Sequence, residues 1–225
     1  MISVVISTLD SEEALAHCLT ALVPAAAEGI VREVVVMDGG SRDATRTVAD
    51  AAGCEMHVVK GSEGARFAAG SKVALKSPWL MFLPAGSMLE PGWHVDASNF
   101  VERAERSGQA ERCAAAFRLK RDAFGWGART GEALSNLSTQ LLGMASSEQG
   151  LLISRRLYTS VGGHRDLGTL SDFDLINRIG RSRLVLLRSA AVAPQDAPRP
   201  ARQKLARFAV SALRLPPRLL AGLKG

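Results

Sequence analysis

Apolar runs bounded by turn residues alternate with segments of helical periodicity over the first half of the chain. The runs are β-branched or continuously apolar, which is typical of buried parallel strands. They cover residues 2–6, 33–37, 56–59 and 79–83. Helices are expected between them, because apolar or small residues recur there three and four positions apart. Strands that alternate with helices predict βαβ units, and hence an α/β fold with a mostly parallel sheet.

The first expected helix carries start and stop signals. Asp10 or Ser11 can cap it, and Asp10 followed by Glu13 resembles a capping box. Pro24 is expected to end it, since proline lacks the N–H that continues a helix. A second helix is expected over 44–52, and a third, rich in small residues, reaches position 74 after a glycine-containing loop.

After Gly92 the alternation loosens and the composition changes towards the end. The expected elements are helices at 95–106, 124–144, 155–161 and 171–179, with strands at 113–119, 149–154 and 183–187. From Ala193 prolines appear, followed by a basic amphipathic helix over 201–215. The sequence therefore predicts one domain at 1–193 and a Pro-containing linker with a basic tail at 194–225.

The charge lies in the tail. The chain has 225 residues and a net charge of +6, and the tail from Arg199 onward holds seven basic residues and no acids. The rest is close to neutral, which argues against nucleic acid as a partner. A basic amphipathic helix suits an anionic membrane surface through residues 199–225, but it also suits packing against the domain. Both interpretations stay open.

Cysteine and histidine usage argues against a disulfide framework or a zinc site. The three cysteines have no ligand-like spacing, and the four histidines are scattered. No apolar run reaches the roughly 18 residues that span a bilayer, and the first residues lack the pattern of a secretory signal. We therefore expect reduced thiols and a cytoplasmic protein, with the tail allowing a peripheral position on the inner face of the cell membrane.

One segment places a carboxylate where ligands bind in α/β folds. The second apolar run stops at Asp38, and Gly39 and Gly40 follow before the next helix. In open α/β sheets, ligands bind at the carboxyl ends of the strands. The alternative is a strand-to-helix turn in which Asp38 only caps the next helix. The segment by itself favours neither.

The motifs and their order resemble the family-two glycosyltransferases of the GT-A fold. The resemblance rests on I-S-V-V-I-S-T-L-D from Ile2, V-V-V-M-D-G-G-S-R-D-A-T from Val34 and W-L-M-F-L-P-A-G-S-M-L-E-P-G-W from Trp79. It continues in S-E-Q-G-L-L-I-S-R-R-L-Y-T-S-V-G-G from Ser147 and L-S-D-F-D-L-I-N-R-I from Leu170. It covers about residues 1–193 and looks closest to a bacterial subgroup with a Gly-Asp-Gln-Gly block ahead of its Glu-Asp motif.

The resemblance implies a single GT-A domain that moves a sugar from a nucleotide-sugar to the hydroxyl of a sugar or lipid-linked acceptor, as in cell envelope polysaccharide synthesis. By position, Asp172 is the general base of an inverting enzyme, and Glu148 and Gln149 border the acceptor. The donor side is implied to comprise Thr8, Leu9, Asp10, Asp38, Gly39, Arg66 and Gly70. A carboxylate suits the role of Asp172, since it can take the acceptor proton as the oxygen attacks.

The chain departs from the family where the metal is held. The family places an aspartate at the end of the fourth strand to bind Mg²⁺ or Mn²⁺, and this chain has Gly86 there. Arg66 and Lys72 are the candidate substitute cations, although Lys72 also suits a solvated helix surface and Arg66 a pair with Glu63. Two functions stay open: a metal-independent transferase, or a degenerate GT-A domain that acts as a binding or scaffold module at the membrane.

Overall fold

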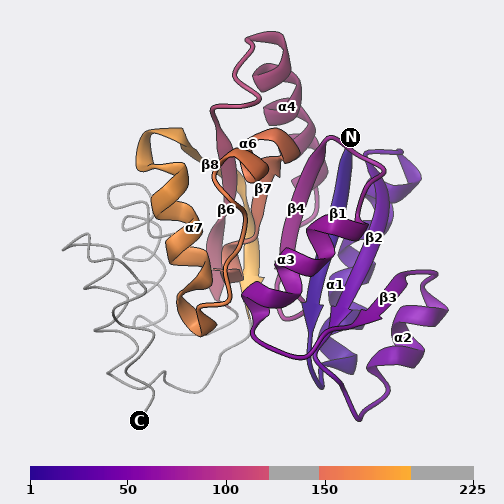
Figure 1. Cartoon of the computed structure of the whole chain (residues 1–225). Helices are drawn as coiled ribbons and strands as arrows, with labels where there is room; N and C mark the ends of the chain where they lie inside the picture. The colour runs from indigo at the N-terminus through magenta and orange to yellow at the C-terminus, as the bar shows by residue number, and fades with distance from the viewer. Residues whose placement is uncertain (122–146, 194–225) are drawn as a thin grey trace.

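The structure is a computed structural model that describes residues 1–121 and 147–193 (Figure 1). Eight strands form one sheet in the order β3-β2-β1-β4-β7-β6-β8-β5. The strands are β1 (Ile2–Thr8), β2 (Val31–Asp38), β3 (Glu55–Val58), β4 (Trp79–Pro84), β5 (Met88–Leu89), β6 (Ala114–Arg121), β7 (Leu151–Ser154) and β8 (Leu184–Ala193). The α-helices are α1 (Glu12–Ala27), α2 (Thr45–Ala51), α3 (Glu63–Val73), α4 (Trp93–Arg106), α6 (Arg155–Ser160) and α7 (Ser171–Ile179). Short 3₁₀ turns are η1 (Ser147–Gln149), η2 (Gly168–Leu170) and η3 (Arg181–Arg183).

The sheet is parallel in its N-terminal half and mixed in its C-terminal half. β1 pairs in parallel with β2 and β4, and β2 pairs in parallel with β3. β7 runs antiparallel to both β4 and β6, whereas β8 is parallel to β6 and antiparallel to β5. The predicted α/β class with a mostly parallel sheet is therefore confirmed.

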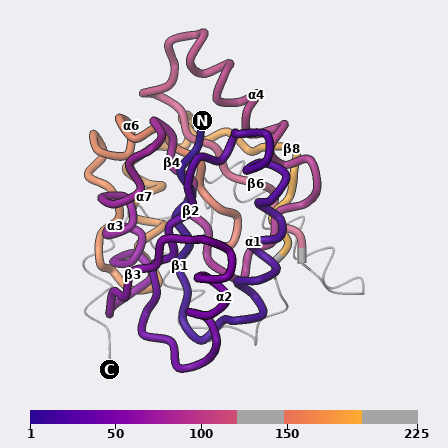
Figure 2. Tube along the Cα trace, turned by 90° about the vertical axis from the view of Figure 1, so that its right-hand side faces the viewer, coloured from indigo at the N-terminus to yellow at the C-terminus, as the bar shows by residue number. Residues whose placement is uncertain are grey.

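Helices cover both faces of the sheet, as the side view shows: α3, α6 and α7 lie on one side, and α1 and α4 on the other (Figure 2). Successive side chains of β1 point to opposite faces of the sheet. Val4 and Ile6 belong to the core under α1 and α4, and Val5 to the core under α3 and α7. Two hydrophobic cores therefore fix the sheet between its helices.

Helix α1 does not end at Pro24, so that prediction was wrong. The helix continues to Ala27, and its buried face includes Leu22 and Ala25 on either side of the proline. Pro24 itself is exposed. The proline removes one N–H donor, but burial of the flanking apolar residues holds the last turn in place.

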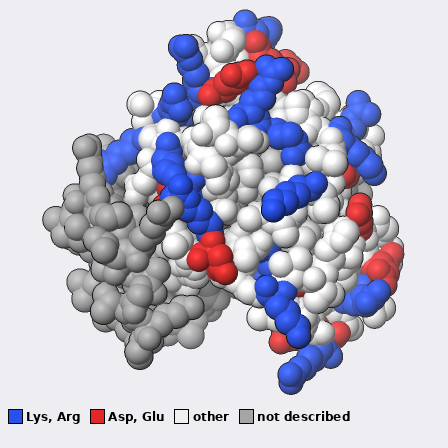
Figure 3. Space-filling view, viewed as in Figure 1, with Lys and Arg blue, Asp and Glu red and all other residues white. Residues whose placement is uncertain are grey.

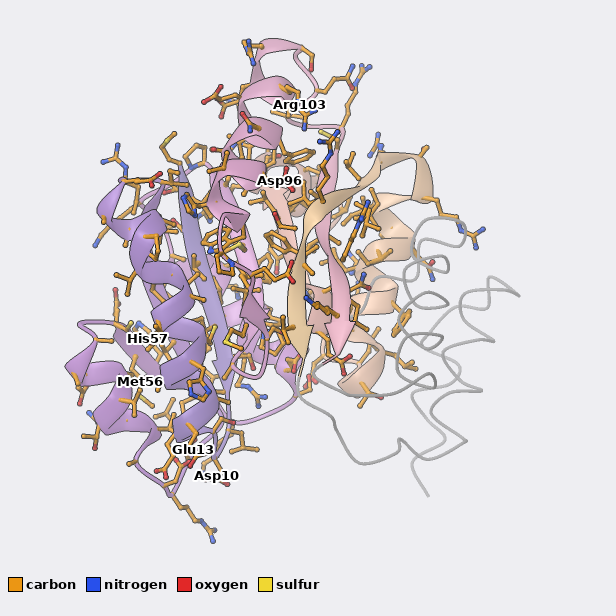
Figure 4. The ribbon with its side chains drawn as sticks, turned by 180° about the vertical axis from the view of Figure 1, so that it is seen from behind. Asp10, Glu13, Met56, His57, Asp96 and Arg103 are labelled. Atoms are coloured by element: carbon orange, nitrogen blue, oxygen red, sulfur yellow. The ribbon has the colours of Figure 1, made fainter. Side chains whose placement is uncertain are left out.

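The predicted capping box of Asp10 and Glu13 is also absent. Both residues lie at the lower end of α1 in Figure 4, but the N-cap is Ser11, and its side chain makes no capping hydrogen bond. Side chains at and just before the start of α2 instead accept hydrogen bonds from the first N–H groups of α1. Ser11 N donates to Thr45 Oγ1 (3.1 Å) and Glu12 N to Asp43 Oδ2 (3.1 Å). Capping is supplied across the structure rather than locally.

Most other elements lie within a few residues of their predicted bounds. The structure adds β5 and extends β8, which was expected over 183–187 only. The helices expected at 124–144 and 201–215, and the division at residue 193, lie outside the described residues or at their border. Every helix in 1–121 and 147–193 is too short or too polar to cross a bilayer.

Candidate functional site

The carboxyl edge of the sheet brings the predicted site residues to one side of the molecule. Thr8 of β1 is in register with Asp38 of β2, and Ser7 with Pro84 of β4, so the three strands end together. β7 runs the other way, so the turn before it, which carries Glu148, lies at the same edge. Helices α3 and α7 begin there, as Figure 1 shows. Six segments of the chain thus meet at this edge.

Asp38 is buried and its carboxylate is used within its own turn. Oδ2 accepts from Gly40 N (2.9 Å) and Ser41 N (2.8 Å), and Oδ1 accepts from the Ser41 hydroxyl. Asp38 therefore stabilises the turn after β2, but it does not cap the next helix, because the N-cap of α2 is Ala44. A remaining lone pair on Oδ1 is what Asp38 can offer a ligand.

The loop after β1 is fastened to the loop after β2. Asp10 N donates to Ser41 Oγ (2.8 Å), and Arg42 N donates to Asp10 Oδ1 (2.8 Å). Asp10 has a φ of 46°, in the left-handed region, and these bonds hold it there. Leu9 points outward and is 48% exposed. The hydroxyl of Thr8 is buried and has no hydrogen-bond partner within the described chain, which leaves a polar atom at this edge for a ligand.

Arg66 is a buried cation at the same edge. It is 8% exposed, its Nε donates to Ser7 Oγ (2.7 Å), and its Nη1 donates to the carbonyl of Gly61 (2.9 Å). It makes no ion pair with any described residue, and the pairing with Glu63 considered from the sequence does not occur. Gly39 lies against it, since a Cβ there would be 3.0 Å from Nη1. A buried guanidinium with only neutral partners favours a site for an anion.

The other candidate cation lies elsewhere. Lys72 is exposed and is six residues further along α3, about 9 Å from Arg66 at 1.5 Å per residue. Gly70 lies between them on the buried side of the helix. A Cβ there would be 2.3 Å from Val5 Cγ1, so the glycine lets α3 approach the sheet closely. Basic side chains are otherwise spread over this face rather than gathered in one patch (Figure 3).

The starts of α3 and α7 are in direct contact. A Cβ on Gly64 would lie 2.2 Å from Ser171 Oγ and 2.8 Å from the carbonyl oxygen of Arg165. Only a residue without a side chain fits there. The contact brings Asp172, the second residue of α7, to the same edge as Arg66.

Asp172 faces a buried histidine. Its Oδ1 lies 3.6 Å from Nε2 of His164, and its side chain is 16% exposed. On the other side of that ring, Nδ1 lies 3.0 Å from the hydroxyl of Tyr158, which also accepts from the backbone N–H of His164 (3.0 Å). Burial raises the pKa of Tyr158 above its ordinary value, so its hydroxyl keeps its proton.

The second aspartate of α7 has a structural role. Asp174 is buried and accepts from Arg178 Nε (2.8 Å), and Arg165 Nη1 lies 3.5 Å away. Arg178 also donates to the carbonyls of Val161 and Gly163. Burial lowers the pKa of Arg178, and its bonds to Asp174 act in the opposite direction. Arg178, held by Asp174, thus fastens α7 to the Gly-Gly turn, and Asp172 is left as the carboxylate of α7 that is available to a ligand.

The end of β4 does not fit a divalent metal. Ala85 is apolar and buried, Gly86 has no side chain, and the Ser87 hydroxyl donates to the carbonyl of Glu148 (2.9 Å). No group of three or more His, Cys, Asp or Glu in the described part of the chain could hold a metal ion. Mg²⁺ and Mn²⁺ require oxygen ligands, above all carboxylates. Among the described residues, this strand end therefore offers neither ion a carboxylate ligand.

Glu148 and Gln149 lie beside that strand end. Gln149 is fully buried, and its amide donates to the carbonyl of Phe117 (3.0 Å), which holds η1 against β6. Glu148 is 9% exposed. The acceptor-side role predicted for the two residues stays a prediction.

Sequence reasoning missed His164 and Tyr158. The signal was the Gly162-Gly163 pair just before the histidine. Both glycines have positive φ (80° and 59°), and a Cβ on Gly163 would lie 2.9 Å from the Tyr158 ring. A turn that requires two glycines and then buries a histidine suggests a positioned side chain.

Comparison with known proteins agrees with the observed fold. The model of glycosyl transferase family 2 matches residues 3–83. Crystal structures of glucosyl-3-phosphoglycerate synthase from Mycobacterium tuberculosis are similar over nearly the whole chain. The complex with Mn²⁺, uridine diphosphate and glucosyl-3-phosphoglycerate has a TM-score of 0.63 and 18% identity, covering 98% of this chain and 79% of that one. The chain has the GT-A fold.

The complex of the same synthase with Mn²⁺ and UDP-glucose gives a TM-score of 0.63 at 20% identity, covering 92% of this chain and 74% of that one. A search of curated proteins found no significant match. The resemblance to family-two glycosyltransferases and the GT-A fold, both predicted from the motifs, are confirmed. At this level of identity the similar structures show the fold.

Proposed function

We propose that the protein transfers a sugar from a nucleotide-diphosphate-sugar to an acceptor hydroxyl, with inversion, and that Arg66 replaces the metal ion. The observation that carries this proposal is the buried Arg66, which has no carboxylate partner among the described residues and lies at the carboxyl edge of a GT-A sheet. The similar synthase binds UDP-glucose, UDP and Mn²⁺. Here the charge of a departing diphosphate would be met by a guanidinium instead.

The reaction uses two groups from adjoining helices, α3 and α7. Asp172 of α7 accepts the proton of the acceptor hydroxyl while the acceptor oxygen bonds to the anomeric carbon. The bond from that carbon to the diphosphate breaks, and the negative charge on the leaving oxygen develops at Arg66 of α3. A charge-assisted, bidentate contact is the strongest that a side chain can offer to phosphate.

The remaining predicted residues have supporting parts. The nucleoside would lie on the two fastened loops, against Thr8, Leu9, Asp10, Asp38 and Gly39. Gly70 would serve the donor indirectly, by letting α3 lie close to the sheet so that Arg66 reaches Ser7. Glu148 and Gln149 would border the acceptor.

Calorimetric titration with UDP and GDP, each with Mn²⁺ and with EDTA, tests the proposal. We expect binding that EDTA does not weaken. Arg66→Ala should weaken it by roughly 10- to 100-fold, because a hydrogen bond to a charged group contributes about 1.5–3 kcal/mol. Lys72→Ala is the matched control, since it removes an exposed cation from the same helix and should change nothing. Binding that requires Mn²⁺ would refute the replacement of the metal by Arg66.

The second candidate function is a degenerate GT-A domain that acts as a binding or scaffold module. The unsuitable donor set at the end of β4 favours it. Failure of every nucleotide and nucleotide-sugar to bind would support this alternative over the transferase.

A separate proposal concerns where the protein is located in the cell. It depends on the tail, residues 199–225, which lies outside the described residues. We infer that the protein works in the cytoplasm, peripherally on the inner face of the membrane, with a sugar or lipid-linked acceptor in cell envelope polysaccharide synthesis. The support is the run of seven basic residues without an acid. Flotation with anionic and neutral vesicles tests it. The full chain should float with anionic vesicles only, and a chain ending at residue 198 with neither.

A further inference from the structure

His164 is a buried titratable residue that the proposed reaction does not yet use. Its side chain is 2% exposed and packs against the rings of Phe67 and Phe82, with centroid distances of 5.1 and 4.7 Å. The two ring nitrogens face different partners, the Tyr158 hydroxyl at 3.0 Å and the Asp172 carboxylate at 3.6 Å. Aromatic packing fixes the plane of the ring, and the polar partners fix its rotation.

These partners determine which nitrogen carries the proton. A lone pair on Nε2 facing a carboxylate would be repelled, so the proton belongs on Nε2. Nδ1 is then an acceptor, and the Tyr158 hydroxyl can donate to it. That hydroxyl accepts from the backbone N–H of His164, and its own proton can be donated to Nδ1. The chain of contacts therefore runs from Tyr158 through His164 to Asp172.

Among the described residues, only this series of contacts holds Asp172. Its only ionic or hydrogen-bonding contact with a described residue is His164, whereas Asp174 binds Arg178 and Arg165. One oxygen of Asp172 faces Nε2, which leaves the other for a ligand. Without His164, rotation of the Asp172 side chain would not be restrained by any described polar group.

We propose that His164 is a positioning residue for the base of the proposed transferase. Its Nε2–H holds Oδ1 of Asp172 so that Oδ2 faces the acceptor hydroxyl. During transfer Oδ2 takes the acceptor proton, the acceptor oxygen bonds to the anomeric carbon and the diphosphate leaves, while His164 keeps its proton. This inference rests on the proposed function. A separation of 3.6 Å exceeds hydrogen-bond length, and such contacts shorten when a substrate is bound.

Two substitutions separate positioning from packing. Gln places its amide nitrogen near the position of Nε2, and Asn places its amide near the position of Nδ1. His164→Gln can therefore still donate to Asp172, and His164→Asn cannot. The control is His57→Asn, which breaks a histidine–carboxylate contact of 2.8 Å between Nε2 and Glu55 on the exposed edge strand β3.

The assay is the release of UDP from UDP-glucose and of GDP from GDP-mannose, with water as the acceptor. We expect His164→Asn to lower kcat by about 10²-fold, since a misplacement near 1 Å has this effect. KM and the calorimetric Kd for the nucleotide should not change, and His164→Gln should recover most of the rate. His164→Asn should add little to Asp172→Asn, because both remove the same base. Equal losses in the Gln and Asn variants would overturn the proposal.

The tautomer is measurable without turnover. Nitrogen-15 spectra of the imidazole rings should show His164 protonated at Nε2 in the wild-type protein, and loss of that preference in Asp172→Asn. Protonation at Nδ1 in the wild type would overturn the contact itself. A wild-type chain that shows the Nε2 tautomer and binds nucleotide, but releases none from either donor, would instead overturn the proposed function and the catalytic role of His164 with it.

Discussion

Replacement of Gly64 by alanine tests the junction on which the site depends. The added Cβ would lie 2.2 Å from Ser171 Oγ, 2.4 Å from Ser171 Cβ and 2.8 Å from the carbonyl oxygen of Arg165. Favourable contacts between heavy atoms begin near about 3.5 Å. Rotation of the Ser171 side chain relieves the first contact only, because the other two involve a Cβ and the backbone. Helices α3 and α7 must therefore separate.

Two opposing effects set the change in the free energy of unfolding that Gly64→Ala should cause. Alanine in place of glycine stabilises a helix by up to about 1 kcal/mol. Overpacking a close contact costs about 1–3 kcal/mol, and the backbone contact places Gly64→Ala at the upper end. The net effect is a loss of about 1–2 kcal/mol in the free energy of unfolding. For a chain of this size, that loss lowers Tm by roughly 2–8 °C.

Urea unfolding followed by circular dichroism measures this change. Ser171→Gly in the same chain removes two of the three contacts, so the double variant should recover part of the stability lost in Gly64→Ala. The four proteins form a cycle whose coupling energy reports the contact. A Gly64→Ala variant as stable as the wild type would show that α3 and α7 do not touch as described. The reasoning about the site edge would then fail.

Two further predictions concern ionisable groups away from the site. Burial opposes ionisation of Asp96, but hydrogen bonds from Ser189 and from the N–H of Arg188 outweigh this effect. The pKa of Asp96 therefore lies below its ordinary value. Figure 4 shows this residue between α4 and β8. The contribution of Asp96 to stability is present above the unfolded pKa of about 3.9 and is lost as the pH falls through the lower folded pKa. Asp96→Asn should therefore lower the free energy of unfolding at neutral pH, and urea unfolding at a series of pH values should show a smaller loss of stability in acid. An unchanged loss of stability in acid would contradict the lowered pKa of Asp96. Burial, with a smaller effect from Cys54, raises the pKa of Cys18 to about 12; a thiol reagent at neutral pH should therefore label Cys54 before Cys18 in the native protein, and early labelling of Cys18 would contradict its burial.

The local sequence pattern was sufficient to predict most helices and strands. It failed where contacts with distant parts of the chain determine the bounds or the capping of an element. Pro24 is a local stop signal, yet burial of Leu22 and Ala25 keeps the helix going. The N-terminus of α1 looked self-capped, but its donors are bound by Asp43 and Thr45 from the neighbouring segment. Strand β5 has two residues, and pairing with β8 rather than its own pattern defines it. Such contacts are properties of the fold rather than of a sequence window.

The same distinction applies to the site. Asp38 and Asp172 were predicted from their positions in a motif, and Arg66 from its place in the loop before a helix, and these three stay predictions. His164 could not be found, because its partners come from α6 and α7 and its packing from α3 and β4. Gly64 was visible only as a glycine in a loop, and its contact with Ser171 joins positions more than one hundred residues apart.

The loops after β1 and β2, which are hydrogen-bonded to each other, affect the enthalpy and the entropy of ligand binding at the carboxyl edge. Contacts within the protein already fix Asp10, Asp38 and Ser41. Ordering a flexible side chain on binding costs about 0.5–1.5 kcal/mol, and here that loss of freedom occurs during folding. A nucleotide would thus meet a preorganised surface. Leu9 projects from it, and replacing its side chain breaks none of these bonds, so selection for a different nucleobase preference should begin at Leu9.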